Sequence, residues 1–337
     1  MRILFITSNR IGDAIQSTGI LSALIAKHPG ARVTVAAGAV SAPLFAALPE
    51  LERLLVMRKR PYAGHWRQLW LETAAIGWDL VVDLRASKFA WTVRCRKSLT
   101  VSSKRDDEPR VVELARLIGA EAAPPAPAVW LTKEQEQVAA AAIPEGPKVL
   151  AVGPTANWIG KTWMPERFAE LVKRLTGPEG LLPGARLAVF GAPGEEAQAE
   201  PVIEALPKDR VIDLVGKADL LLTAACLRRC AFFIGNDSGL MHLSAAAGVP
   251  TLGLFGPSSE RRYGPWGSHC GYVRTPESLE EITTQPGYHH TLPKSWMTSL
   301  EVDKVEAAAV ALFRKLEAGS LQAREQPLTG GENVGQG

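Results

Sequence analysis

Short apolar segments alternate with longer amphipathic segments along most of the chain. This alternation predicts strands and helices that follow one another, and strands this apolar are typical of a parallel sheet covered on both faces. The expected strands are Ile3–Thr7, Val33–Ala37, Leu54–Met57, Leu80–Asp83, Val149–Val152, Arg186–Phe190, Val211–Asp213, Phe232–Gly235 and Thr251–Phe255. The expected helices are Asp13–Lys27, Ser41–Leu48, Phe168–Leu175, Ala197–Leu206, Leu220–Arg229, one that begins at about Gly239, and 303–317. The pattern predicts an α/β protein.

Prolines interrupt the alternation near the middle of the chain. Pro124, Pro125 and Pro127 precede a short helical segment, and Glu145-Gly146-Pro147 follows it. We therefore place an interdomain linker between residues 122 and 147. The prediction is two Rossmann-like, doubly wound parallel-sheet domains, 1–135 and 146–302, that face a central cleft at the carboxyl ends of their strands. Residues 303–318 are expected to form a helix that packs back on the N-terminal domain, and 319–337 a flexible tail.

The composition indicates a folded protein without a membrane span. Of 337 residues, 46% are hydrophobic and 22% are charged, but no apolar segment reaches the ~18 residues that a spanning helix needs. The first residues have the pattern of a buried strand and not of a signal peptide, so we expect a cytoplasmic protein. The cysteines are too few for a disulfide framework, and Cys226 and Cys230 are expected to pack in a core helix.

Positive charge is concentrated in one region. The net charge is +3, but residues 53–105 carry twelve Lys and Arg against three acidic residues. Within this region Arg58-Lys59-Arg60 and Arg67 lie among aromatic residues such as Trp66 and Trp70. Basic charge interleaved with Trp suits a membrane interface or a phosphorylated glycolipid, and a solvated loop with a packed helix is the alternative. No recognised nucleic-acid module is present, so we do not expect nucleic acid as a partner.

The segment after Phe232–Gly235 has the features of an anion site. It contains Asp237 and Ser238 where a helix N-cap is expected, and then Gly239, which lets a ligand approach the backbone closely. The free amides and the positive end of the following helix attract anions. His242 falls within about the first turn of this helix, on a side that can face a diphosphate. The alternative is a plain cap with a packed histidine.

Three further turns after predicted strands carry polar side chains. Asp13 follows the first strand in Arg10-Ile11-Gly12-Asp13, without the G-x-G-x-x-G spacing of a dinucleotide-binding turn. This carboxylate is suited to take a proton from a hydroxyl group, or it merely opens a helix. Lys161, preceded by Asn157, offers a mobile charge to a phosphate, with a solvated lysine as the alternative. Glu195 and Glu196 follow a strand where a carboxylate commonly bonds ribose hydroxyls, and the sequence does not distinguish them.

Together these segments resemble glycosyltransferase family 9, the ADP-heptose:lipopolysaccharide heptosyltransferases. The family has an Asp-(Thr or Ser)-Gly-Leu-x-His segment, which here begins at Asp237, a Gly-Asp pair, which here is Gly12-Asp13, and a Lys-x-Trp-Pro-like segment, which here begins at Lys161. The similarity extends over roughly residues 1–315 and is loose in the middle of the N-terminal domain.

The chain departs from the family pattern at three positions. Asn157 replaces the usual Thr or Ser, and Met164 is inserted before Pro165. Ala218 stands where a larger side chain borders the adenine, so the departure weakens the inference that the base is adenine.

The resemblance implies a GT-B enzyme that transfers a sugar with inversion, first of all heptose from ADP-heptose, to a lipopolysaccharide core or a related anionic acceptor. It implies Asp13 as the catalytic base, with no cofactor and no metal. The implied donor contacts are Asn157, Lys161, Glu195, Glu196, Asp237, Ser238, Gly239, Leu240 and His242. The implied acceptor contacts are Arg10, Arg58, Lys59, Arg60 and Arg67.

The resemblance also implies a peripheral contact with the cytoplasmic face of the inner membrane. Two alternatives remain open: transfer from another nucleotide sugar, and a nucleotide-binding scaffold without turnover. A nucleotide-dependent oxidoreductase is disfavoured, because the glycine-rich dinucleotide fingerprint is absent.

Overall fold

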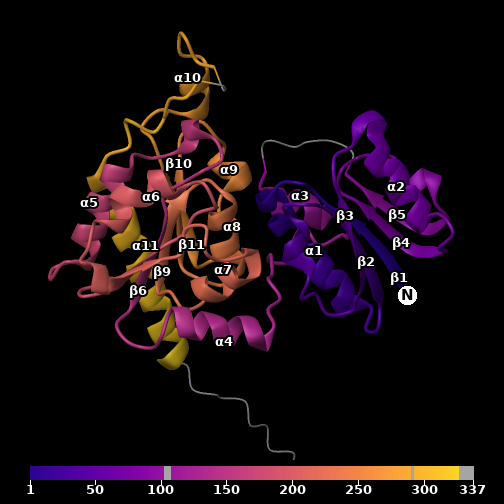
Figure 1. The fold of residues 1–337 in the computed structure, drawn as a ribbon, viewed down its shortest axis with the longest axis horizontal. Helices are drawn as coiled ribbons and strands as arrows, with labels where there is room; N and C mark the ends of the chain where they lie inside the picture. Colours follow the sequence, from indigo (N-terminus) through magenta and orange to yellow (C-terminus); the bar gives the residue numbers. More distant parts are fainter. Residues whose placement is uncertain (102–107, 290–291, 326–337) are drawn as a thin grey trace, which may run out of the picture.

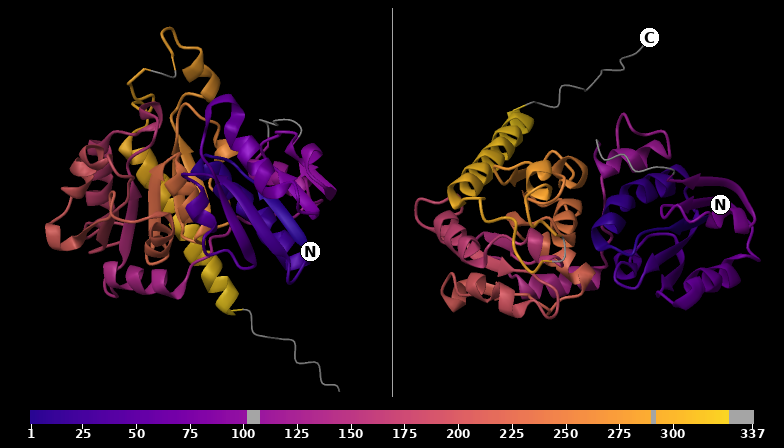
Figure 2. Two further views of the ribbon diagram at one scale, coloured as in Figure 1. Left: turned by 45° about the vertical axis from the view of Figure 1, so that its right-hand side comes forward. Right: turned by 90° about the horizontal axis from the view of Figure 1, so that it is seen from above.

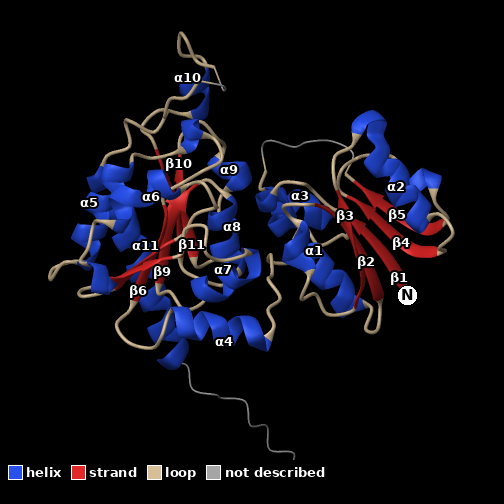
Figure 3. Ribbon diagram, in the orientation of Figure 1, coloured by secondary structure: helices blue, strands red, loops and turns tan. Residues whose placement is uncertain are grey.

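The computed structural model describes residues 1–101, 108–289 and 292–325, and side chains as far as residue 318. Each half of the chain forms a parallel sheet covered by helices (Figures 1 and 3). The predicted α/β architecture with two Rossmann-like domains is confirmed.

The N-terminal sheet has five parallel strands in the order β3-β2-β1-β4-β5. They are β1 (Arg2–Ile6), β2 (Arg32–Gly38), β3 (Leu51–Met57), β4 (Trp78–Asp83) and β5 (Cys95–Thr100). The helical elements are α1 (Ile11–Lys27), η1 (Ala42–Phe45), η2 (Pro61–Ala63), α2 (Gly64–Thr73), η3 (Phe89–Thr92) and α3 (Arg110–Arg116). The central strand β1 is apolar from Ile3 to Ile6 because all four side chains are fully buried.

The C-terminal sheet has six parallel strands in the order β11-β10-β9-β6-β7-β8. They are β6 (Val149–Gly153), β7 (Arg186–Val189), β8 (Val211–Asp213), β9 (Phe232–Asn236), β10 (Thr251–Phe255) and β11 (Cys270–Arg274). The helical elements are α4 (Lys133–Ala142), η4 (Ile159–Lys161), α5 (Pro165–Thr176), α6 (Glu196–Ile203), η5 (Lys208–Arg210), α7 (Leu220–Leu227), α8 (Gly239–Ala246), α9 (Glu260–Tyr263), α10 (Leu279–Thr283) and α11 (Val302–Glu325). The strand order reverses between β6 and β9, which is where open α/β sheets bind their ligands.

Several elements differ from the sequence prediction, and the helices α3, α9 and α10 were not predicted. The helix predicted at Ser41–Leu48 is wrong: only the short η1 forms, and Pro49 disfavours a helical conformation at Leu48. The strands β5 and β11 were not predicted. Both lie at sheet edges and lack a continuous apolar run, since an edge strand is buried on fewer sides.

The chain passes between the two domains within the predicted linker, 122–147, and before α4 begins at Lys133. The proline-rich segment lies along α1, where the amide of Ala128 donates a hydrogen bond to Oγ1 of Thr18 at 2.8 Å. The next helix, α4, packs on α7 of the C-terminal domain. The predicted domain boundary at residue 135 therefore falls inside a helix of the C-terminal domain.

The last helix packs on the C-terminal domain and not, as predicted, back on the N-terminal one. The principal contacts of α11 are with α5, β10 and β11 (Figure 2). Its buried face, which includes Val305, Ala309 and Leu312, joins the hydrophobic cluster of the C-terminal sheet. The helix continues to Glu325, into the segment predicted as a flexible tail, and residues 326–337 lie outside the described residues. Within the described part of the chain, no helix combines the length and apolar character needed to cross a membrane.

The two domains meet mainly through α1 and α8 (Figure 1). The middle of α1, residues 14–21, is buried, including the polar residues Gln16, Ser17 and Thr18, because the helix is covered by its own sheet and by α8. Buried side chains of both domains, among them Ile15 and Met241, form one continuous hydrophobic cluster. The turn that carries Asp13 is therefore held directly against the helix that follows the predicted anion site.

Candidate active site

The turns after β6 and β9 meet at the switch point of the C-terminal sheet. Lys161 ends η4, and its Nζ lies 2.5 Å from Oδ2 of Asp237, which follows β9. Asp237 is buried, whereas Lys161 keeps a quarter of its side chain exposed. A buried carboxylate requires such a partner, so this ion pair holds a cation at the switch point.

Asn236, at the end of β9, positions the turn that carries Lys161. Its amide nitrogen donates to the carbonyl of Pro154 at 2.8 Å, and its amide oxygen accepts from the backbone amide of Trp163 at 3.0 Å. The side chain is completely buried. The two bonds bracket the segment that contains Lys161. Sequence reasoning did not select Asn236, although an Asn at the end of an apolar strand was a signal for it.

The N-terminus of α8 lies beside this ion pair. Ser238 is the N-cap, as predicted, but its side chain makes no capping hydrogen bond, and its buried Oγ has no partner among the described groups. The first backbone amides of α8 are therefore not used by the cap and remain suited to bind an anion. Close packing explains Gly239, because a Cβ there would lie 3.0 Å from Cγ2 of Ile11.

His242 lies in the interface between α8 and α1. It is buried, and its Nδ1 lies 3.5 Å from the amide nitrogen of Gln16, which makes a long hydrogen bond across the two domains. Burial lowers the pKa of His242, although the nearby carboxylates of Asp237 and Asp13 oppose this shift. The imidazole is therefore neutral near pH 7. With the Gln16 amide donating to Nδ1, the ring proton is on Nε2.

Gly12 and Asp13 begin α1 on the opposite side of this interface. A Cβ at Gly12 would lie 2.9 Å from Cδ2 of His242, so the approach of the two helices explains the glycine. Asp13 is partly buried, and its Oδ2 accepts a hydrogen bond from Oγ of Ser8 at 3.3 Å. The structure thus brings Asp13 into the electrostatic environment of His242, together with Asp237 and Lys161.

The two predicted ribose contacts are held in different ways. Oε2 of Glu195 accepts from Oγ1 of Thr155 at 2.5 Å and from the amide of Ala192 at 2.8 Å, which ties it to the turn after β6. Glu196 accepts from the amide of Gly194 at 3.1 Å, and hydrogen bonds from its own amide and that of Gly194 lower the pKa of its carboxyl. Glu195 therefore belongs to the switch point, while Glu196 lies against the neighbouring Gly216 loop.

The remaining predicted contacts are exposed. Asn157 lies on the surface of the turn after β6. Arg10, Arg58, Lys59, Arg60 and Arg67 all have exposed side chains. Arg10 and the basic run that begins at Arg58 follow β1 and β3, at the same edge of the N-terminal sheet as Asp13, whereas Arg67 lies on α2. Arg85 follows β4 at the same edge of the sheet, and its guanidinium lies 4.9 Å from the ring of Trp66.

A buried ion pair between the domains was also missed. Nη2 of Arg262 in α9 lies 2.7 Å from Oε2 of Glu113 in α3, and Nη1 of Arg110 lies 2.6 Å from the same oxygen. Glu113 and Arg262 are both almost completely buried. Only the tertiary structure pairs them, since 149 positions separate them.

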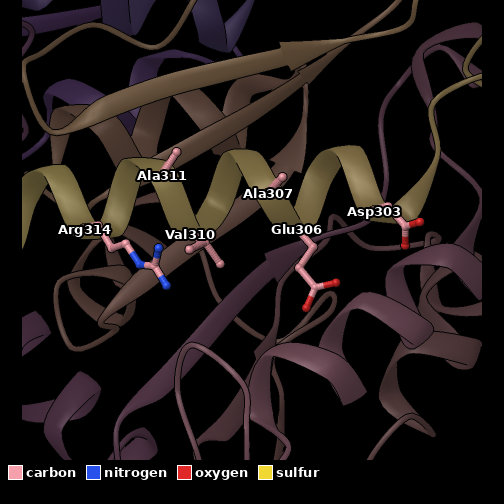
Figure 4. A pocket seen from close by; sticks show the side chains of 6 residues that line it. All are labelled: Asp303, Glu306, Ala307, Val310, Ala311 and Arg314. Carbon is pink, nitrogen blue, oxygen red and sulfur yellow. The ribbon is translucent and has the colours of Figure 1, made fainter.

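Other predicted features are structural. Cys226 and Cys230 are buried in one hydrophobic cluster, as predicted, and burial raises the pKa of Cys226 to about 11. No group of three or more His, Cys, Asp or Glu among the described residues is arranged to hold a metal ion. A hollow of ≈ 500 Å³ lies along α11 (Figure 4), and none of the predicted site residues lines it. Its acidic side chains Asp303 and Glu306 are already paired with Arg174.

Comparison with solved structures shows the fold over nearly the whole chain. A glycosyl transferase family 9 structure from Veillonella parvula has a TM-score of 0.76 and 21% identity, and the match covers 93% of this chain and 97% of that one. The structure of E. coli ADP-heptose lps heptosyltransferase II has a TM-score of 0.71 and 20% identity, covering 94% and 100%. Lipooligosaccharide heptosyltransferase 2 of Haemophilus influenzae is 24% identical over 335 residues, covering 87% of this chain and 95% of that protein.

The two facing Rossmann-like domains, with a cation and a helix N-terminus at the switch point, have the GT-B architecture. The model of glycosyltransferase family 9 (heptosyltransferase) matches residues 89–286. The chain belongs to this family.

Proposed function

We propose that this enzyme transfers heptose from ADP-heptose to a lipopolysaccharide core or a related anionic acceptor, with inversion at the anomeric carbon. The observation that carries the proposal is the Lys161–Asp237 pair beside the free N-terminus of α8, directly opposite the turn of Asp13. Relatives named as lipopolysaccharide or lipooligosaccharide heptosyltransferases support the choice of donor and acceptor.

The proposed reaction needs one base and one anion site. The Asp13 carboxylate takes the proton of an acceptor hydroxyl, and that oxygen forms a bond to the anomeric carbon of the donor. The bond from this carbon to the diphosphate breaks, and its electron pair leaves with ADP. Lys161, the amides at the start of α8 and Nε2–H of neutral His242 stabilise the new negative charge; fixed donors of this kind are each worth about 3 kcal/mol.

We propose that the transfer requires no metal, because a lysine and a helix N-terminus already supply positive potential for the diphosphate. Full activity in a chelator would support this, and loss of activity that Mg²⁺ restores would contradict it.

Because the proposed acceptor is anchored in lipid, we place the enzyme at the cytoplasmic face of the inner membrane.

One residue, Ala218, favours a second candidate for the nucleotide of the donor. Ala218 offers a small side chain near the loop proposed to border the base, so a donor with uridine or guanosine diphosphate is the alternative. Thermal unfolding with ADP, UDP, GDP and NADH tests the choice. Selective stabilisation by ADP, followed by heptosyl transfer from ADP-heptose, supports the proposal. Selective stabilisation by UDP or GDP contradicts ADP-heptose as donor, and a response to NADH alone contradicts the proposed chemistry.

A further inference from the structure

The outward face of α2 carries apolar side chains where a solvated helix normally has polar ones. Leu69 and Thr73 point inward and are buried, and Trp66 packs on Phe89 of η3 with ring centroids 5.8 Å apart. Trp70 and Leu71 remain exposed on the other side, at 43% and 68%. The core therefore accounts for the inward residues of α2, but it leaves much of the Trp70 side chain and most of the Leu71 side chain exposed.

The neighbouring turn η3 extends this apolar face. Nε1 of Trp70 donates a hydrogen bond to the carbonyl of Thr92 at 2.9 Å, which fixes η3 beside α2. Trp91, one residue earlier, is 79% exposed. Three of the four exposed aromatic side chains among the described residues, Tyr62, Trp70 and Trp91, belong to this part of the N-terminal domain. An exposed cluster of this kind usually marks an interaction surface.

Positive charge surrounds these apolar side chains. Arg67 is exposed and lies one turn before Trp70 and Leu71 on the same side of α2. Nζ of Lys88 lies 5.8 Å from the ring of Trp91. We refer to Arg67, Trp70, Leu71, Lys88 and Trp91 as the α2–η3 face. Trp and Leu flanked by Arg and Lys are the composition of segments that lie at the surface of an anionic bilayer.

The α2–η3 face differs from the basic residues of β5, and it lies away from the domain interface. Arg96 and Lys97 lie on the edge strand β5, where charge prevents pairing with another sheet, so they need no ligand. The backbone of Lys88 is left-handed, with φ 60°, a conformation that costs a non-glycine residue about 1 kcal/mol. In Figure 1, α2 lies on the side of the N-terminal domain away from the C-terminal domain. Contact at this face would therefore leave the domain interface clear.

We propose that the α2–η3 face docks on an anionic phospholipid bilayer, with Trp70, Leu71 and Trp91 in the interfacial layer and the basic side chains on the headgroups. This inference deepens the proposed function, since it names the surface by which the enzyme meets the membrane that holds its acceptor. Each buried apolar side chain and each surface-bound cation adds to the affinity. Binding depends on both features, and salt weakens the electrostatic part.

Vesicle sedimentation tests this proposal without donor or acceptor. The full chain is mixed with vesicles of phosphatidylcholine that contain phosphatidylglycerol, and with vesicles of phosphatidylcholine alone. We expect binding to the anionic vesicles, which weakens as salt is raised, and a loss of ~10-fold or more in the variant Leu71→Ser/Trp91→Ser. The control is Val138→Ser/Tyr272→Ser, which removes one aliphatic and one aromatic side chain, each 51% exposed, from the C-terminal domain and should bind as the wild type does. A thermal melt of each variant verifies folding.

Failure of the wild type to bind anionic vesicles would overturn the proposal, as would equal binding by Leu71→Ser/Trp91→Ser or equal binding to neutral vesicles. Transfer assays separate this result from the proposed function. The face variant should keep wild-type activity on a deacylated, soluble acceptor and lose it on an acceptor in vesicles. If the wild type binds anionic vesicles as predicted but transfers no heptose to either acceptor, the result contradicts the proposed function and still supports the α2–η3 face as a docking surface.

Discussion

Lys161 and Asp237 are 76 positions apart in the sequence, yet Nζ of Lys161 lies 2.5 Å from Oδ2 of Asp237. The pair spans the turns after β6 and β9, the two strands between which the strand order reverses. The buried carboxylate fixes the lysine, and the lysine compensates the carboxylate. An arriving diphosphate would therefore find a cation that is already positioned.

Removal of Lys161 should affect both stability and donor binding. In Lys161→Ala the buried Asp237 loses its partner, so we expect the free energy of unfolding to fall by about 1–3 kcal/mol. The nucleotide-induced shift in melting temperature should shrink as well. The double variant Lys161→Ala/Asp237→Asn should recover most of the stability but not the nucleotide shift. Lys173→Ala, which alters an exposed lysine of α5, is the matched control and should change neither quantity. Recovery of the nucleotide-induced shift in the double variant would show that Lys161 contributes to stability and not to nucleotide binding.

The pH dependence of stability should report the buried His242. Burial lowers its pKa in the folded protein below the usual 6.5, so below that pH the unfolded chain binds more protons. The contribution of His242 to stability is therefore fully present above pH 6.5 and is lost as pH falls toward the folded pKa. We expect the melting temperature of His242→Gln to fall less steeply between pH 7 and pH 5 than that of the wild type. Parallel curves for the two proteins would contradict a lowered pKa.

Asp13→Asn should reduce kcat by about 10²–10⁴-fold, because an amide cannot accept the acceptor proton. Donor binding should remain within about twofold of the wild type, since the donor contacts lie on the C-terminal domain. Isothermal titration with ADP and steady-state kinetics measure the two effects separately. Ser8→Ala removes the hydrogen bond to Oδ2 of Asp13 and the one that Oγ of Ser8 accepts from the amide of Arg10, but it keeps the Asp13 carboxylate and should have a much smaller effect. An unchanged kcat in Asp13→Asn would exclude this residue as the base.

The Glu113–Arg262 ion pair should hold the two domains together. Glu113→Gln leaves buried positive charge from Arg110 and Arg262 without its carboxylate, so we expect a loss of about 3–5 kcal/mol in the free energy of unfolding. The double variant Glu113→Leu/Arg262→Met replaces both charges with apolar groups and should be less destabilised than Glu113→Gln alone. Chemical denaturation compares these variants with the wild type and with the two single variants Glu113→Leu and Arg262→Met. If the double variant loses as much stability as the sum of the single variants, the two residues are not coupled.

Much of the fold follows from local pattern. Fully buried strands such as β1, β6 and β9 must be continuously apolar, and the sequence shows these runs directly. Elements that are buried on fewer sides leave a weaker pattern, so β5 and β11 were missed. The prolines around residue 125 indicated that the domains separate there. The packing of α4 on α7 depends on long-range contacts that the local sequence pattern does not predict.

The sequence by itself determined the two-sheet architecture and the turns that carry Asp13, Lys161 and Asp237, because hydrophobic period, turn residues and short motifs are local properties. Only the tertiary structure decided that Lys161 pairs with Asp237, that Gln16 reaches His242 and that Glu113 meets Arg262. It also decided that α11 joins the C-terminal sheet and that Trp70, Leu71 and Trp91 face outward. These outcomes depend on which surfaces remain uncovered once both sheets are packed, and burial of that kind is a property of the whole chain.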